Sequence, residues 1–126
     1  MAKSLFKGLE GIFIPVKDPV ESMIWYEEIL GFKRIYHEED AAVMKIDEQA
    51  QTVVCLVKAH QHLAMSFPDN SFGVGKYYNF IPSGPIEDIY RSLKAMNVRT
   101  GALGGDGETR FFTFYDPDGN PLGVCQ

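Results

Sequence analysis

Three histidines are the most obvious candidates for metal or acid–base chemistry in this chain, and two of them, His60 and His62, form a His-x-His pair. Two imidazoles placed two residues apart on a strand point to the same side, where they could seat a metal ion. The pair lies in a segment rich in turn-forming residues, with no carboxylate close by in sequence. Exposed or packed loop histidines are therefore the competing interpretation, and the same holds for His37.

The two cysteines, Cys55 and Cys125, each end a Val-Cys pair. Two are too few for a disulfide scaffold. A reactive thiol needs nearby positive charge that lowers its pKa, and the sequence supplies no evidence of such charge. We interpret both as buried and inert or as lining a cavity, with catalysis as the remaining alternative.

Composition limits the class of protein that could carry these residues. The chain has 126 residues, of which 45% are hydrophobic and 13% aromatic, which predicts one folded domain. Its net charge of −5 argues against nucleic-acid binding, which usually shows as a basic patch. No apolar run approaches the length of a membrane span, and the first residues lack a secretory signal pattern. We expect a soluble, cytoplasmic protein.

The chain contains an internal repeat, which is the signature of a duplicated unit. Phe-Ile-Pro occurs twice, and so do a Pro-x-Glu motif after it and the Val-Cys pair near the end, always in the same order and at offsets of 66 to 70 residues. The repeat predicts a first module over about residues 6–58, a connector over about 59–76 and a second module over about 77–126. The connector could let the second module pack on its own first module or on that of a partner chain.

The first module has the pattern of a strand, a helix and three more strands. Asp18 can cap a helix in which Pro19 occupies the first turn, and Gly31 suits the left-handed conformation that ends it. The apolar β-rich runs that flank this helix predict strands over residues 9–16, 32–37, 42–46 and 52–57.

The second module repeats that order. Pro85 opens its helix, and Asn97 takes the place of Gly31, because asparagine is the next best residue for that conformation. Strands are predicted over residues 77–81, 98–100, 110–115 and 121–125, and the glycine-rich residues 102–108 are predicted to form a mobile loop.

The motifs that accompany this order resemble the vicinal oxygen chelate superfamily of glyoxalases, bleomycin-resistance proteins and extradiol dioxygenases. They are Ile-Pro-Val-Lys-Asp at 14–18, Trp-Tyr at 25–26, Leu-Gly-Phe at 30–32 and Phe-Thr-Phe-Tyr-Asp-Pro-Asp-Gly-Asn at 112–120. The resemblance implies an α+β fold in which two βαβββ modules form an eight-stranded half-barrel around a cavity. Homodimers are common in the family, so we expect one here.

The resemblance also implies where a metal would bind, on the first and last strands of each module. The four positions hold Gly11, Val53, Tyr78 and Gly123, and a one-residue slip would bring in Glu10 or Asn79 instead. Glycine and valine offer no donor atom and a phenol is an uncommon ligand, whereas a divalent ion needs several ligands. We therefore expect no cofactor at this site.

Strand alternation assigns the aromatic residues to faces. Phe13, Tyr78 and Phe80 alternate onto the side of Gly11, the expected cavity face, while Ile12, Ile14 and Ile81 would pack under the helices. An aromatic cavity with an occasional arginine suits a small planar or amphipathic ligand. The predicted lining of the cavity is Phe13, Cys55, Tyr78, Phe80, Arg110 and Phe112.

Three functional interpretations follow. The first is a metal-free module that binds a hydrophobic or aromatic small molecule. The second is a lyase, isomerase or dioxygenase that depends on a divalent metal ion held by a rearranged set drawn from Glu10, His37, His60 and His62. The third is a structural or protein-interaction role with a collapsed cavity. One fold carries many functions, so the fold does not choose among them, and the vacant ligand positions favour the first.

Overall fold

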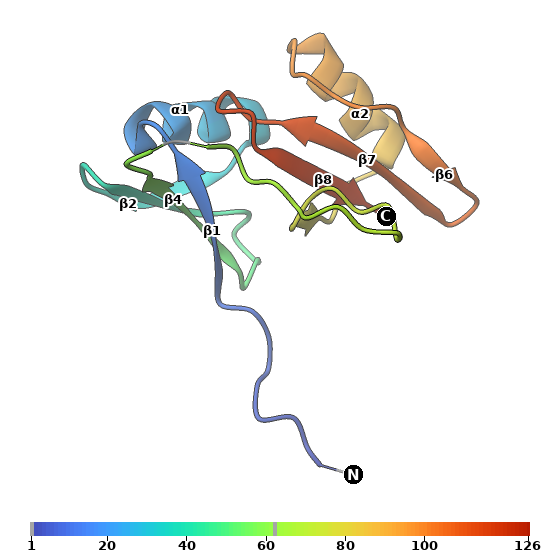
Figure 1. Ribbon diagram of the computed structural model, residues 1–126, viewed down its shortest axis with the longest axis horizontal. Coiled ribbons are helices and arrows are strands. Elements are labelled where there is room, and N and C mark those ends of the chain that lie inside the picture. The colour runs from blue at the N-terminus through green and yellow to red at the C-terminus, as the bar shows by residue number, and fades with distance from the viewer. Residues whose placement is uncertain (1, 62) are drawn as a thin grey trace. The chain divides into compact units, whose positions relative to one another are not determined.

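The computed structural model describes residues 2–61 and 63–126. It divides into two compact units, residues 1–62 and 63–126, and each unit is one βαβββ module (Figure 1). The predicted α+β class and the duplication are both confirmed. None of the helices in the described part of the chain is long and apolar enough to span a lipid bilayer.

The first module builds one four-stranded mixed sheet in the order β1-β4-β3-β2. The first strand runs parallel to β4, and the other two pairings are antiparallel. The elements are β1 (Gly11–Val16), α1 (Pro19–Leu30), β2 (Lys33–His37), β3 (Ala41–Lys45) and β4 (Val53–Lys58).

The second module repeats this topology, with the order β5-β8-β7-β6 and a parallel pairing of β5 with β8. Its elements are β5 (Asn79–Phe80), α2 (Ile86–Ala95), β6 (Gly104–Asp106), β7 (Thr109–Tyr115) and β8 (Pro121–Cys125).

Each helix begins and ends where the local chemistry predicts. Asp18 Oδ1 accepts hydrogen bonds from the backbone N–H groups of Val20 and Glu21 at 3.0 and 3.3 Å, which satisfies two free donors of α1. Gly31 ends α1 with a φ of 76°. After α2, Asn97 adopts a φ of 62°, which confirms that it takes the role of Gly31.

One face of each sheet packs against its helix and forms the core of the module. In the first module alternate residues of β1 and β4 are buried there together with Met23 and Tyr26 of α1. In the second module Phe112 and Phe114 of β7 lie on the corresponding face, and the Tyr90 ring of α2 meets Phe112 edge to face at 5.1 Å. Among the described residues, no helix of the same module packs on the opposite face of either sheet, and we call this the uncovered face of that sheet.

The glycine-rich stretch differs from its prediction as a mobile loop. Gly104–Asp106 forms β6 and pairs antiparallel with β7, while the expected strand at 98–100 is reduced to a single bridge between Thr100 and Phe114. The hairpin closes at Gly107-Glu108, with Gly107 at a φ of 58°. Glycine at the first of the two loop residues supplies the positive φ that such a tight turn requires.

The connector is not a structureless linker in its second half. Residues from 63 onward belong to the second unit. Met65 N–H donates to Asn120 Oδ1 at 2.8 Å, and Asn70 Oδ1 accepts from the backbone of Gly73 and Val74. The Tyr77 ring packs against that of Phe67, with the ring centroids 4.9 Å apart and the planes tilted by 52°. These bonds hold the segment before β5 against its own module.

Candidate functional site

The uncovered face of the first sheet is an apolar surface built by strand register. Phe13 of β1 lies opposite Cys55 of β4, which lies opposite Val43 of β3. The next row pairs Pro15 with Val57. Side chains in register on one face are close neighbours, so these residues form one continuous surface. Phe13 is 67% exposed on it, which is unusual for so large an apolar group.

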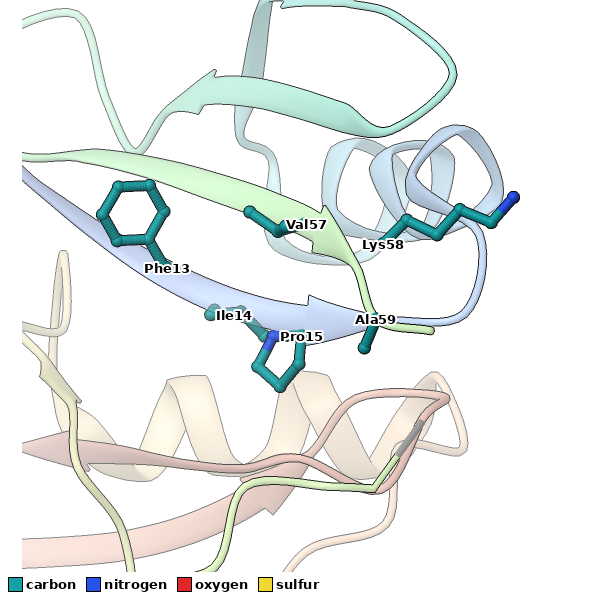
Figure 2. A pocket seen from close by; sticks show the side chains of 6 residues that line it. All are labelled: Phe13, Ile14, Pro15, Val57, Lys58 and Ala59. Carbon is teal, nitrogen blue, oxygen red and sulfur yellow. The ribbon is translucent and has the colours of Figure 1, made fainter. Parts of the chain in front are cut away.

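A hollow of about 350 Å³ opens where β1 and β4 run side by side (Figure 2). Its size falls within the usual range for small-molecule sites, about 300–1,000 Å³. Figure 2 shows the amine of Lys58 directed away from the Phe13 ring, so the hollow itself presents mainly carbon. It is lined by Phe13, Ile14, Pro15, Val57, Lys58 and Ala59.

The thiol of Cys55 beside this surface is not set up as a nucleophile. Burial raises the pKa of the Cys55 thiol above its ordinary value, and the negative charge of Glu10 raises it further. The group is therefore protonated near neutral pH, and the thiolate is the reactive form. Cys55 and Cys125 are both free cysteines.

The uncovered face of the second sheet is organised around Gly123 of β8. Asn79 of β5 lies in register with it on one side and Thr113 of β7 on the other. A Cβ added at Gly123 would overlap Asn79 Oδ1 and the end of the Lys76 stem, with Lys76 Cδ at 2.7 Å. Lys76 and Asn79 thus fill the space that a side chain at this position would need, and they bury the glycine.

The positions that the family uses for metal ligands do not fit a divalent ion here. Gly11 and Val53 stand in register in the first sheet, and neither has a donor atom. In the second sheet the partner of Gly123 is Asn79 rather than Tyr78, and the place of the last ligand is covered by the lysine stem. Over residues 2–61 and 63–126, no three His, Cys, Asp or Glu side chains gather closely enough to hold a metal ion.

The alternative ligands are scattered. His60 lies exposed just beyond β4, His37 ends β2 on the surface, and Glu10 precedes β1. His62 lies outside the described residues. The described members of this group therefore do not come together as a set of metal ligands.

Several predicted lining residues lie on the helix-covered face instead. Phe80 is in register with the buried Val124, and its ring lies 6.4 Å from that of Phe114. Phe112 is 1% exposed in the core under α2. By the same alternation Ile81, which was expected under the helix, is 90% exposed. The face assignments of Phe80 and Ile81 are wrong because β5 pairs one residue further along than the Phe-Ile-Pro repeat suggests. Phe112 lies on the covered side because it is in register with the buried Val124.

Arg110 has a structural partner on that covered side. Its Nη1 donates to Glu87 Oε2 of α2 at 2.6 Å, which ties β7 to the first turn of the helix. Phe13 and Cys55 lie in register on the uncovered face of their sheet. Tyr78 immediately precedes β5, and its carbonyl oxygen accepts from Gly123 N–H at 2.9 Å.

The sequence reasoning missed Lys76. Lys76 is the last residue of the predicted connector, so it was not assigned to a strand face. The one-residue shift that places Asn79 opposite Gly123 could have indicated it. In that register the glycine leaves a space beside Asn79 that a long side chain nearby in sequence, such as Lys76, can fill.

Comparison with known proteins identifies the fold and the family. No curated protein is significantly similar to the chain in sequence. A glyoxalase family protein from Enterococcus faecalis has a similar structure, with a TM-score of 0.75 and 22% identity over 98% of this chain and 100% of its own.

Two resistance or antibiotic-binding proteins are also similar. TnmS3, an antibiotic binding protein from Streptomyces sp. CB03234, has a TM-score of 0.70 and 19% identity over 97% of both chains. The fosfomycin resistance protein FosX from Listeria monocytogenes has a TM-score of 0.73 and 18% identity over 96% of this chain and 93% of its own. At these identities the likeness shows a shared fold. The family model of the Glyoxalase/Bleomycin resistance protein/Dioxygenase superfamily matches residues 8–124, and the chain therefore belongs to that superfamily.

Proposed function

We propose that this protein binds a hydrophobic or aromatic small molecule on the uncovered face of its first sheet. One observation carries the proposal, the largely exposed Phe13 at the edge of an apolar hollow of about 350 Å³. A planar ligand that covers this ring removes apolar surface from water. Full burial of a phenylalanine side chain stabilises by about 1.5–3 kcal/mol.

The chemistry of the surface supports binding rather than turnover. Metal-dependent catalysis in this superfamily takes its ligands from the first and last strands of each module, and three of the four equivalent positions here, Gly11, Val53 and Gly123, have no side-chain donor atom. The nearest nucleophile, Cys55, has a raised pKa. Antibiotic binding by the similarly folded TnmS3 supports a sequestering role for this fold. The absence of a cofactor, the homodimer and the cytoplasmic location remain predictions.

A ligand titration tests the proposal directly. Two-dimensional ¹H–¹⁵N NMR spectra of the full chain are recorded with 2-naphthamide, a neutral planar probe. We expect saturable shifts in the amides of β1 and β4, and Phe13→Ala should weaken binding by about tenfold or more, since the lost burial corresponds to at least that ratio. Phe72→Ala is the matched control, because Phe72 is a highly exposed phenylalanine in the second unit.

Two results would overturn the proposal. One is the absence of any saturable shift in β1 and β4 with naphthamide or with a panel of larger aromatic and drug-like compounds. The other is equal binding by the Phe13→Ala and Phe72→Ala variants, which would place the ligand elsewhere.

A further inference from the structure

A second site lies on the uncovered face of the second sheet, at the point where Lys76 and Asn79 cover Gly123. The lysine stem lies against the glycine, so the packing of the methylene groups restricts where the ammonium can go. Lys76 is half-buried, whereas Asn79 is exposed and accessible to a ligand. The two polar ends thus sit together beside one strand position.

These two groups are unused within the described part of the protein. No carboxylate lies within 4 Å of the Lys76 ammonium, and the Asn79 side-chain amide has no hydrogen-bond partner there. The chain has more carboxylates than basic groups, with a net charge of −5, and Lys76 still pairs with none of the described ones. The ammonium of a half-buried lysine and an amide without a partner together suit an anionic oxygen group, because charge-assisted hydrogen bonds are stronger than neutral ones.

An apolar surface adjoins this pair. The neighbouring row of the same face places Cys125 in register with Phe111. Ile81 follows β5 and is 90% exposed, and Phe111 is 44% exposed. An anion with an apolar body could therefore place its charge at Lys76 and its body on these side chains.

A similar replacement occurs in the first sheet. Lys45 of β3 stands in register with Val53, in the row where the family places metal ligands, and Lys33 stands opposite Lys45. Lysine residues therefore adjoin the ligand positions of both rows: Lys45 is in register with Val53 in the first sheet, and the Lys76 stem lies over Gly123 in the second. This charge pattern repels a divalent cation and attracts an anion.

We propose that Lys76 and Asn79 form a binding site for the carboxylate group of a hydrophobic organic acid on the second module. The Lys76 ammonium donates to the carboxylate, the Asn79 amide donates a second hydrogen bond, and Ile81 and Phe111 cover the apolar body. The residues of this site belong to the second module, whereas those of the site proposed above belong to the first, and carboxylate binding here needs no metal ion.

The test compares three small probes on the full chain by NMR titration. They are 2-naphthoate, its neutral analogue 2-naphthamide, and acetate, which carries the carboxylate without the ring. We expect naphthoate to shift the amides of Asn79 and Gly123 and to bind there about tenfold more tightly than naphthamide, the ratio typical of one charge-assisted hydrogen bond. Lys76→Met, which keeps the stem over Gly123, should abolish that preference.

Matched variants separate this site from the first one. Lys94→Met removes a lysine from the exposed side of α2 and should leave the preference intact. Phe13→Ala should also leave it intact. A preference that survives Lys76→Met, or that disappears in Phe13→Ala, would overturn the inference while leaving the proposed function in place.

The remaining outcomes are equally decisive. Equal shifts of the Asn79 and Gly123 amides by naphthoate and naphthamide would overturn the anion site. Shifts at these amides with acetate in wild type but not in Lys76→Met would support the anion site even if no aromatic probe binds β1. The absence of shifts at these amides with naphthoate would overturn the inference without reference to any variant.

Discussion

Asn79 stands in register with Gly123, and its side-chain oxygen lies in the space that a Cβ at position 123 would require. The corresponding pair in the first sheet is Gly11 with Val53. In each sheet, the pair of positions that the family uses to ligate a metal thus includes one glycine. In the first sheet the side chain of Val53 lies beside Gly11, and in the second Asn79 and Lys76 fill the space beside Gly123. The following predictions test the consequences of this arrangement.

Gly123→Ala should destabilise the protein by about 1–3 kcal/mol, the usual cost of forcing an extra methyl group into a packed site. The added Cβ would overlap Asn79 Oδ1 and the Lys76 stem. Urea denaturation measures the change. Gly84→Ala is the control, because nothing lies within 4 Å of its Cβ and its φ is not positive. A stability loss no larger than that of the control would contradict the packing described for Lys76.

Asn79→Ala should recover part of that loss when it is combined with Gly123→Ala. The single Asn79→Ala variant removes an exposed side chain and should change stability by less than about 0.5 kcal/mol, as most surface substitutions do. The double variant should therefore lie closer to wild type than Gly123→Ala does. Strict additivity of the two changes would show that they do not share the same space.

Asn120→Ala should destabilise the second module by about 1–3 kcal/mol, the cost of leaving a buried hydrogen-bonding group without its partner. Asn120 is fully buried, donates from Nδ2 to Asp116 Oδ2 at 2.9 Å and accepts from Met65 N–H at 2.8 Å. Urea denaturation gives the stability, and amide hydrogen exchange at Met65 reports the local bond. Unchanged exchange at Met65 would contradict the role of this bond in holding the connector.

Cys55 should react slowly with thiol reagents at pH 7, because burial and then the charge of Glu10 raise its pKa. The rate measured with 5,5′-dithiobis(2-nitrobenzoate) in a Cys125→Ser background should rise only at pH values above the ordinary thiol pKa. Glu10→Gln should move the profile part of the way back. Because the pKa of Cys55 is higher in the folded than in the unfolded chain, the thiol contributes to the free energy of unfolding at pH values below its unfolded pKa. This contribution is lost as the pH rises through the folded-state pKa. A profile at or below that of free cysteine would refute this assignment.

Metal addition should leave the melting temperature unchanged. The described ligand positions offer no donor set, and lysines stand in both rows. Melting is measured in EDTA and then with Mn²⁺, Ni²⁺, Zn²⁺ and Fe²⁺ in turn. A metal bound only by the native state at about 100 times its Kd would add about 2.7 kcal/mol and raise the midpoint by several degrees. A saturable shift that EDTA reverses would make the metal-dependent enzyme the leading interpretation.

Local chemistry was enough to predict most of the backbone. Asp18, Gly31 and Asn97 all take the roles that their side chains or permitted dihedral angles favour. These signals act within a few residues, so they are readable without knowing what lies across the sheet. The glycine that opens the Gly107-Glu108 turn is a signal of the same local kind, and the hairpin was missed because the glycines around it were interpreted as a loop.

The sequence by itself determined the duplicated βαβββ order, the helix ends and the lack of donor atoms at Gly11 and Val53, because these depend on residue type and short-range spacing. The tertiary structure decided which face each residue of β5 occupies. A strand alternates with a period of two, so the one-residue difference that pairs Asn79 with Gly123 moves Phe80 to the covered side and Ile81 to the open side. It also decided that Lys76, distant in sequence from Gly123, packs over it. Both depend on which strands pair across the chain, a long-range choice that local spacing does not specify.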